Sequence, residues 1–338
     1  MNARPFQALG GLALSLALAA CGQPAAKGST LPAASPTGLT KIAVGYPNFR
    51  SAHIPLWVAK EAGIFEQNGI DADLRNLGGT VTNDSIVAGD TQFCSCNGAV
   101  AVNADAAGSD LVIIATLLPV VDTVFQAAPG IKTAADLKGK KVGISGLGQA
   151  GEITVKIALK QLGLDPNKDV TLLSVGSVAH EVPAFEGGAI QAALTSPPDS
   201  LVLETKGFNT LVRLADLKLS TASASVTVQR SWLSAHHDLA QKYVDSLMQA
   251  TAKAKRDKAF TMDVLRKYQK QDDESLLNAT YDLYVGKLLS SLPYPATEQL
   301  TDAVNELATT NAKAPSLDLN RLIDTSFVKS AADRGLDR

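Results

Sequence analysis

Strand-like and helix-like segments alternate along residues 41–125, and this alternation strongly constrains the fold. Residues 41–46 contain Ile and Val and end at Pro47, as expected for a strand and the loop after it. Residues 111–117 form an almost unbroken apolar run, which is typical of a strand buried on both faces. The alternation starts again near residue 131. Because strands that alternate with helices form parallel layers, the sequence predicts two α/β units.

Two short segments, residues 88–93 and 187–192, repeat one pattern. Each predicts a helix end, a Gly-containing turn and a short strand, and each is followed by exposed polar residues. In open α/β sheets, ligands bind at the carboxyl ends of the strands. We therefore expect the polar loops of the two units to face each other across a cleft.

The composition is that of a folded chain with real cores. The chain has 338 residues, of which 46% are hydrophobic and 19% are charged, and its formal net charge is −2. This length allows two domains or one large one. Basic and acidic residues are interspersed, so we expect no nucleic-acid partner.

The N-terminus predicts export. Arg4 precedes an apolar run over residues 12–20, which is too short for a permanent membrane span and predicts a signal peptide over residues 1–20. The run ends at Ala20-Cys21 and resembles the lipobox of bacterial lipoproteins, which implies lipidation of Cys21. The alternative is an ordinary signal peptide with a chance cysteine. Residues 21–40 are rich in Pro, Gly, Ser and Ala, so they are interpreted as a flexible linker behind the lipid anchor.

The remaining cysteines and the histidines predict little else. Cys94 and Cys96 are too few and too close in sequence for a disulfide framework. The four histidines are His53, His180, His236 and His237. Because they do not combine with cysteines at ligand spacing, we expect no metal site.

Three stretches carry a family resemblance. They are residues 55–70, residues 136–144, and the Gly-rich turn into residues 192–194 with the following Pro197-Pro198. The chain resembles the periplasmic solute-binding proteins of the nitrate/sulfonate/thiamine-pyrimidine type from about residue 41 to residue 330. The resemblance implies an α/β, two-lobed periplasmic binding protein fold (type II) with two crossover hinge strands.

The resemblance also implies where the lobes lie and how they move. Lobe 1 would contain residues 41–125 and 228–338, and lobe 2 residues 126–227, with hinges near residues 123–126 and 225–228. Binding of a ligand would close the lobes. Family members often carry an acidic residue in the strand after the Gly turn, where this chain has Gln92 and Gln191. The ligand therefore cannot be carried over from the family.

The loop over residues 46–53 is the first candidate for ligand contact, through Asn48, Ser51 or His53. The alternative is a surface loop in which Ser51 caps the following helix and His53 is solvated. Arg50 is the weaker candidate, because an arginine is more often solvated than bound to a ligand.

The second candidate loop contains Ser95, Cys96 and Asn97 at the start of a helix, where free backbone N–H groups attract oxygen-rich ligands. The alternative is a simple helix cap. Free cysteines are usually small buried hydrophobes, so Cys94 is assigned to the core and Cys96 is the better candidate for the site.

The third candidate loop contains Ser145, Gly146 and Gln149 within a G-x-G-x-x-G pattern. A dinucleotide site would need an acidic residue at the end of the next strand, but that strand ends at Gly176. The glycines are better explained by close approach of the backbone to a small ligand. Thr195 and Ser196 complete the set with hydroxyl groups.

No nucleophile with an adjacent base is evident, since Ser145 lacks a G-x-S-x-G context and no H-E-x-x-H occurs. We therefore expect no enzyme and no cofactor. The resemblance implies the substrate-binding component of an ABC importer, which captures a small polar organic molecule or oxyanion and delivers it to a membrane permease and its ATPase. The expected form is a monomeric, exported lipoprotein that faces the periplasm or the cell exterior. The alternatives are an exported ligand-sensing lipoprotein and a pyrimidine-synthase-like enzyme on the same fold.

Overall fold

The computed structural model describes residues 38–144, 146, 150–175 and 178–338. Residues 33–338 form one compact unit. The predicted signal peptide, Cys21 and most of the predicted linker lie outside the described residues, as do Ser145 and Gln149.

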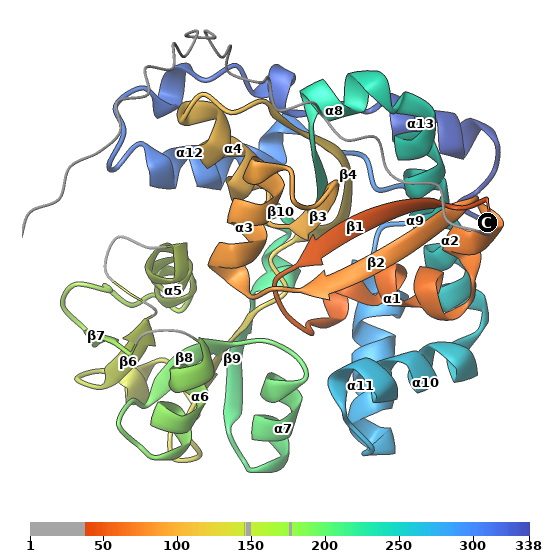
Figure 1. The fold of residues 1–338 in the computed structure, drawn as a ribbon. Helices are drawn as coiled ribbons and strands as arrows, with labels where there is room; N and C mark the ends of the chain where they lie inside the picture. The colour runs from red at the N-terminus through yellow and green to blue at the C-terminus, as the bar shows by residue number, and fades with distance from the viewer. Residues whose placement is uncertain (1–37, 145, 147–149, 176–177) are drawn as a thin grey trace, which may run out of the picture. The chain divides into compact units, whose positions relative to one another are not determined.

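The first five-stranded sheet has the order β2-β1-β3-β10-β4 (Figure 1). Its strands are β1 (Thr40–Tyr46), β2 (Ile70–Asn76), β3 (Phe93–Cys96), β4 (Leu111–Val120) and β10 (Ser220–Gln229). β1 pairs in parallel with β2 and β3, whereas β10 runs antiparallel to β3 and β4.

The second sheet repeats this arrangement in the order β7-β6-β8-β5-β9. Its strands are β5 (Val124–Ala127), β6 (Lys141–Ile144), β7 (Thr171–Ser174), β8 (Ala192–Thr195) and β9 (Asn209–Arg213). β6 pairs in parallel with β7 and β8, and β5 runs antiparallel to β8 and β9. Each sheet is the centre of one lobe, so the prediction of two α/β units is confirmed.

The chain passes between the sheets twice, at residues 121–123 and at residues 214–219. These crossings differ from the predicted lobe boundaries. The boundary at residue 125 falls inside β5, and the boundary at residue 227 falls inside β10. The predicted and observed boundaries differ most at β10. The residues predicted as the second hinge, 225–228, are instead paired with β3 and β4 inside the first sheet.

Helices cover the sheets of both lobes. In lobe 1 the α-helices before the first crossing are α1 (Ile54–Glu61), α2 (Ile64–Gln67), α3 (Gly79–Ala88) and α4 (Ala99–Ala106). In lobe 2 they are α5 (Ala150–Gln161), α6 (Val178–Glu186) and α7 (Asp199–Thr205). After β10, lobe 1 adds α8 (Arg230–Ala235), α9 (His237–Arg256), α10 (Lys258–Gln269), α11 (Glu274–Leu283), α12 (Thr301–Leu307) and α13 (Ser326–Asp333). None of the helices in the described part of the chain is long and apolar enough to cross a membrane.

The two repeated segments perform the same structural task in both lobes. The Gln92 side-chain oxygen accepts a hydrogen bond from the Ala43 backbone N–H at 2.8 Å, and the Gln92 N–H donates to the Ala43 carbonyl. In lobe 2, the Gln191 side-chain oxygen accepts from the Lys141 N–H at 3.1 Å, and the Gln191 N–H donates to the Lys141 carbonyl. Gln92 therefore ties the start of β3 to β1, and Gln191 ties the start of β8 to β6 in the same way.

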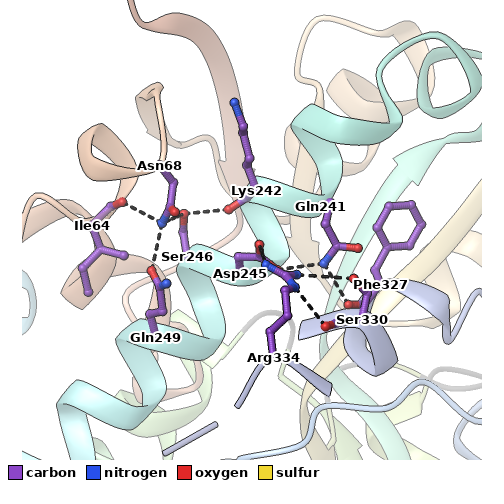
Figure 2. Close-up of polar contacts among 10 residues, drawn as sticks. All are labelled: Ile64, Asn68, Gln241, Lys242, Asp245, Ser246, Gln249, Phe327, Ser330 and Arg334. Atoms are coloured by element: carbon purple, nitrogen blue, oxygen red, sulfur yellow. Dashed lines mark hydrogen bonds and ion pairs between the residues drawn. The ribbon is translucent and has the colours of Figure 1, made fainter. Parts of the chain in front are cut away.

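α9 joins the C-terminal part of the chain to the core of lobe 1. The ring of Tyr243 on α9 stacks on Phe93 of β3 and on Phe65 of α2, with centroid distances of 4.1 and 5.6 Å. On another face of α9, Asp245 receives two hydrogen bonds of 2.6 Å from the guanidinium of Arg334, just beyond α13 (Figure 2). This pair fixes the C-terminal end of the described chain against the core.

Candidate functional site

A cavity of about 450 Å³ lies between the two lobes, beside the crossings. Lobe 1 contributes polar side chains to its wall: Asn97, Asn103, Thr221, Ser223, Asp302 and Glu306. Lobe 2 contributes Ile144, Thr154, Ile157, Leu194, Thr195 and Ser196. These residues include the carboxyl ends of β6 and β8 and the residue directly after β3, which is where open α/β sheets bind ligands.

Asn97 and Ser196 occupy equivalent places in the two lobes and line the same cavity, as the repeated pattern predicts. Asn97 follows β3, and its side-chain oxygen accepts a hydrogen bond of 2.9 Å from the Ala99 N–H at the start of α4. A Cβ atom at Gly98 would lie 2.6 Å from the Cβ of Ala222, so the close packing of this residue against β10 requires glycine. Asn97 can therefore bond to the start of α4 and line the cavity at the same time, so the two interpretations of this residue are compatible.

Thr195 lines the cavity from the end of β8, but it is buried and already engaged. Its hydroxyl donates a hydrogen bond of 2.6 Å to the Gln126 side-chain oxygen, and the Gln126 amide donates to the Ser200 carbonyl at 2.9 Å. A threonine hydroxyl can donate only one proton, so Thr195 can offer a ligand only an acceptor in this arrangement.

The predicted residues of the first loop serve the interior of lobe 1 and do not line the cavity. Ser51 is buried and accepts a hydrogen bond of 2.8 Å from Gln269 instead of capping a helix. Asn48 accepts from the Arg50 N–H at 3.1 Å. His53 is also buried, which excludes the alternative in which it is solvated. Its Nδ1 lies 2.9 Å from the Ser95 hydroxyl, and Ser95 is buried too.

The environment of His53 keeps its imidazole neutral. Burial, followed by the nearby positive charge of Arg50, lowers the pKa of His53 to about 3, and the carboxylate of Asp122 only partly opposes this. A neutral imidazole has one donor and one acceptor nitrogen, which suits its single hydroxyl partner.

Arg50, Asp122 and Tyr284 form a network at the first crossing. Asp122 is 2% exposed, forms an ion pair with Arg50 and accepts a 2.6 Å hydrogen bond from the Tyr284 hydroxyl. Burial and the adjacent carboxylate raise the pKa of Tyr284 well above its usual value, so the phenol stays protonated and donates. Arg50 and Asp122 both line the cavity. Asp122 was not among the predicted site residues, although a single carboxylate two residues after a buried strand was a usable signal.

Cys94 and Cys96 are joined by a disulfide and are buried in the part of the lobe 1 core that lies around α4. Residues two apart in a strand point to the same face, which brings the two sulfur atoms together. This corrects the expectation of free thiols. Cys96, the better candidate of the two for ligand contact, does not line the cavity.

Only part of the third loop can be placed. Ser145 and Gln149 lie outside the described residues, and Gly146 is buried without lining the cavity. Gly151 and Thr154 of α5 line the cavity just beyond this loop. Within the described ranges, no three His, Cys, Asp or Glu side chains come together as a metal site.

A second cavity, of about 740 Å³, lies at the crossings and is lined by residues 119–120 and 122–124, by residues around the second crossing, and by α11 and the π-helical turn after it. This second cavity is larger than the one lined by Asn97 and Ser196. None of the residues at the carboxyl ends of β1, β3, β6 or β8 contributes to it. The smaller cavity is therefore the better candidate site.

Comparisons with known proteins agree with this fold. A family model described as NMT1/THI5 like matches residues 50–258. YtlA of Bacillus subtilis, named as a candidate binding protein, is 25% identical over 251 residues, which cover 72% of each chain.

Solved structures show the same fold at lower identity. The periplasmic aliphatic sulphonate binding protein SsuA from Escherichia coli has a TM-score of 0.69 and 21% identity, over 84% of this chain and 92% of that one. The periplasmic nitrate-binding protein NrtA from Synechocystis PCC 6803 has a TM-score of 0.69 and 15% identity, over 88% and 89%. The desulfurization enzyme DSZB has a TM-score of 0.62 and 17% identity, over 87% and 99%. Because the family model spans more than half of its residues, this chain belongs to the NMT1/THI5-like family.

Proposed function

We propose that this chain is the solute-binding component of an ABC importer, which captures a small molecule between its lobes and delivers it to a membrane permease. One observation carries the proposal: equivalent turns of two repeated lobes bring Asn97 and Ser196 to one cavity of about 450 Å³. Cavities of this size are typical of small-molecule sites. The names of SsuA, NrtA and YtlA, which refer to binding, support the same function.

We further propose binding without catalysis, although one structural neighbour is an enzyme. Among the described residues that line the cavity there is no His, Cys, Lys or Tyr. The nearby His53 is buried and bonded to Ser95, and Cys96 is held in a disulfide. Catalysis by a cysteine–histidine pair needs the two groups within hydrogen-bond reach of each other at the site, and His53 and Cys96 do not meet that condition.

A screen by thermal shift tests the function. The full-length protein is heated with sulfonates, nitrate, pyrimidines and vitamins, and a true ligand raises the melting temperature because it binds the folded state alone. Ser196→Ala should reduce the shift, whereas Ser234→Ala, which changes an exposed serine bonded to the Arg230 carbonyl, should not. Failure of every compound to stabilise the protein would contradict the proposal.

We also propose that the chain is exported and anchored through Cys21, on the basis of the apolar run that ends there. A stable anchor requires more than one acyl chain. Cys21→Ser should move the protein from the membrane fraction to the soluble fraction of cells. Mass spectrometry that finds residues 2–20 on membrane-bound protein would contradict the assignment.

A further inference from the structure

The walls of the cavity differ between the two lobes, and this difference bears on the ligand that the proposed function requires. Lobe 2 presents three aliphatic side chains, Ile144, Ile157 and Leu194, next to its hydroxyl groups. Lobe 1 presents mainly amide, hydroxyl and carboxyl groups. An apolar wall gains free energy when it covers the apolar part of a ligand, and it offers no hydrogen bonds to a small ion.

The charges on the walls are also unequal. The described cavity residues include one cation, Arg50, and three carboxylates, Asp122, Asp302 and Glu306, so their formal charge is 1 − 3 = −2. Arg50 is paired with Asp122, and this pair contributes no net charge. The two remaining carboxylates are those of Asp302 and Glu306.

Asp302 and Glu306 lie four residues apart on α12, where side chains share one face of a helix. Glu306 takes part in a further interaction within the protein. Asp302 is exposed, and no hydrogen bond or ion pair to it is found among the described residues. A ligand with a positively charged group would gain from the carboxylate of Asp302, whereas an oxyanion would be repelled.

We infer that the site takes an organic molecule with an apolar body and a positively charged nitrogen, either a cation or a zwitterion. The apolar body packs against Ile144, Ile157 and Leu194, and the charged nitrogen faces α12. The volume of about 450 Å³ fits such a molecule and far exceeds that of a nitrate ion. This inference rests on the proposed function and narrows its substrate class.

Three probes with one apolar body test the inference: pentylammonium, 1-pentanol and 1-pentanesulfonate. Their binding to the full-length protein is measured by calorimetry at low ionic strength, where charge effects are least screened. We expect pentylammonium to bind most tightly and pentanesulfonate most weakly, with dissociation constants that differ by at least about tenfold, as expected of a charge-assisted contact. Tighter binding of the sulfonate would overturn the inference.

Asp302→Asn provides the matched variant. It should weaken pentylammonium binding about threefold to fivefold, the effect of a partly exposed ion pair, and leave pentanol binding unchanged. Glu298→Gln is the control, because Glu298 is exposed, precedes Asp302 by one helical turn and does not line the cavity. Equal effects of the two substitutions on pentylammonium would overturn the inference, since only the net charge of the protein would then matter.

The outcomes also separate this inference from the proposed function. If a bare oxyanion from the wider screen binds best, the chain is still a solute-binding protein and the charge assignment is wrong. If no compound of any charge binds, both are wrong.

Discussion

Single buried polar residues define the inner end of the candidate site. Asp122 accepts from Arg50 and Tyr284, so one carboxylate ties the loop after β1 to the first crossing and to the turn after α11. Breaking a buried ion pair by removing one partner usually costs several kcal/mol, because the other charge stays buried. The same neighbourhood keeps His53 neutral. These residues lie at the inner end of the cavity, and Asn97 and Ser196 line its walls.

Asn97→Ala and Ser196→Ala should each weaken ligand binding about twofold to tenfold, the effect of losing one hydrogen bond of about 0.5–1.5 kcal/mol. Asn97→Ala should also lower the melting temperature of the free protein, because the bond to the Ala99 N–H is lost. Calorimetry with a ligand from the screen and thermal melts without it measure the two effects. Unchanged affinity in both variants would mean that the site lies elsewhere.

Stability should fall in acid because of His53. Its pKa is about 3 in the folded protein and about 6.5 in an unfolded chain, so between these values the unfolded state binds a proton that the folded state does not. The free energy of unfolding should therefore decrease by up to about 1.4 kcal/mol for each pH unit below about 6.5, and should be unaffected by this group at higher pH.

Urea unfolding at several pH values between 7 and 4 measures this slope. His53→Gln should make the slope shallower, and His237→Gln should leave it unchanged, because the side chain of His237 is 63% exposed. Identical slopes for the protein and its His53→Gln variant would contradict the assignment.

At the scale of elements, α9 is the support on which α2, β3 and α13 are assembled. Tyr243 packs between Phe65 and Phe93, and Asp245 holds Arg334 near the C-terminus. Figure 2 shows a second polar group on the same helix, where the Asn68 amide reaches the Ser246 hydroxyl and the Gln249 side chain. One long helix thus binds segments from both ends of the lobe 1 sequence.

Arg334→Ala should lower the free energy of unfolding by about 1–2 kcal/mol, because Asp245 is buried and would lose both of its 2.6 Å bonds. This loss of stability is smaller than that expected for a fully buried ion pair, because the Arg334 side chain is 46% exposed and solvent screens its charge. Lys329→Ala on α13 removes an exposed pair with Asp333 and should change stability far less than Arg334→Ala does. Chemical denaturation of both variants makes the comparison, and equal losses would contradict it.

At the scale of the whole molecule, two lobes of matching topology are joined by two short crossings. Residues at and next to both crossings, including Val121, Thr123 and Leu219, line the candidate cavity. Rotation about the crossings would therefore change the width of the site directly. A ligand that contacts both walls stabilises the closed arrangement, since it gains contacts there that the open one lacks.

Binding should therefore make the protein more compact. Small-angle scattering of the full-length protein should show a smaller radius of gyration when the ligand is saturating. The double variant Asn97→Ala/Ser196→Ala should need more ligand for the same change, because each lobe has lost one contact. Tight binding with no compaction would rule out lobe closure as the response to the ligand.

Local patterns in the sequence were enough to predict the two α/β units and most of their strands. Residues 41–46 and 192–195 form β1 and β8, and the paired segments at Gln92 and Gln191 tie equivalent strands together. These features depend on side-chain periodicity, turn residues and short repeats, all of which involve residues that are close together in the sequence.

The polar residues that meet at the cavity could not be predicted from the sequence and are seen only in the tertiary structure. Asp302 and Glu306 lie about 200 residues beyond Asn97 in the sequence but share a wall with it, because the chain returns to lobe 1 through β10. His53 and Ser95 looked like ligand contacts, yet they pack against each other inside the lobe. The sequence determined the elements, since local propensity acts between near neighbours. The site was decided by the tertiary structure, because burial and contact between distant segments depend on how the whole chain packs.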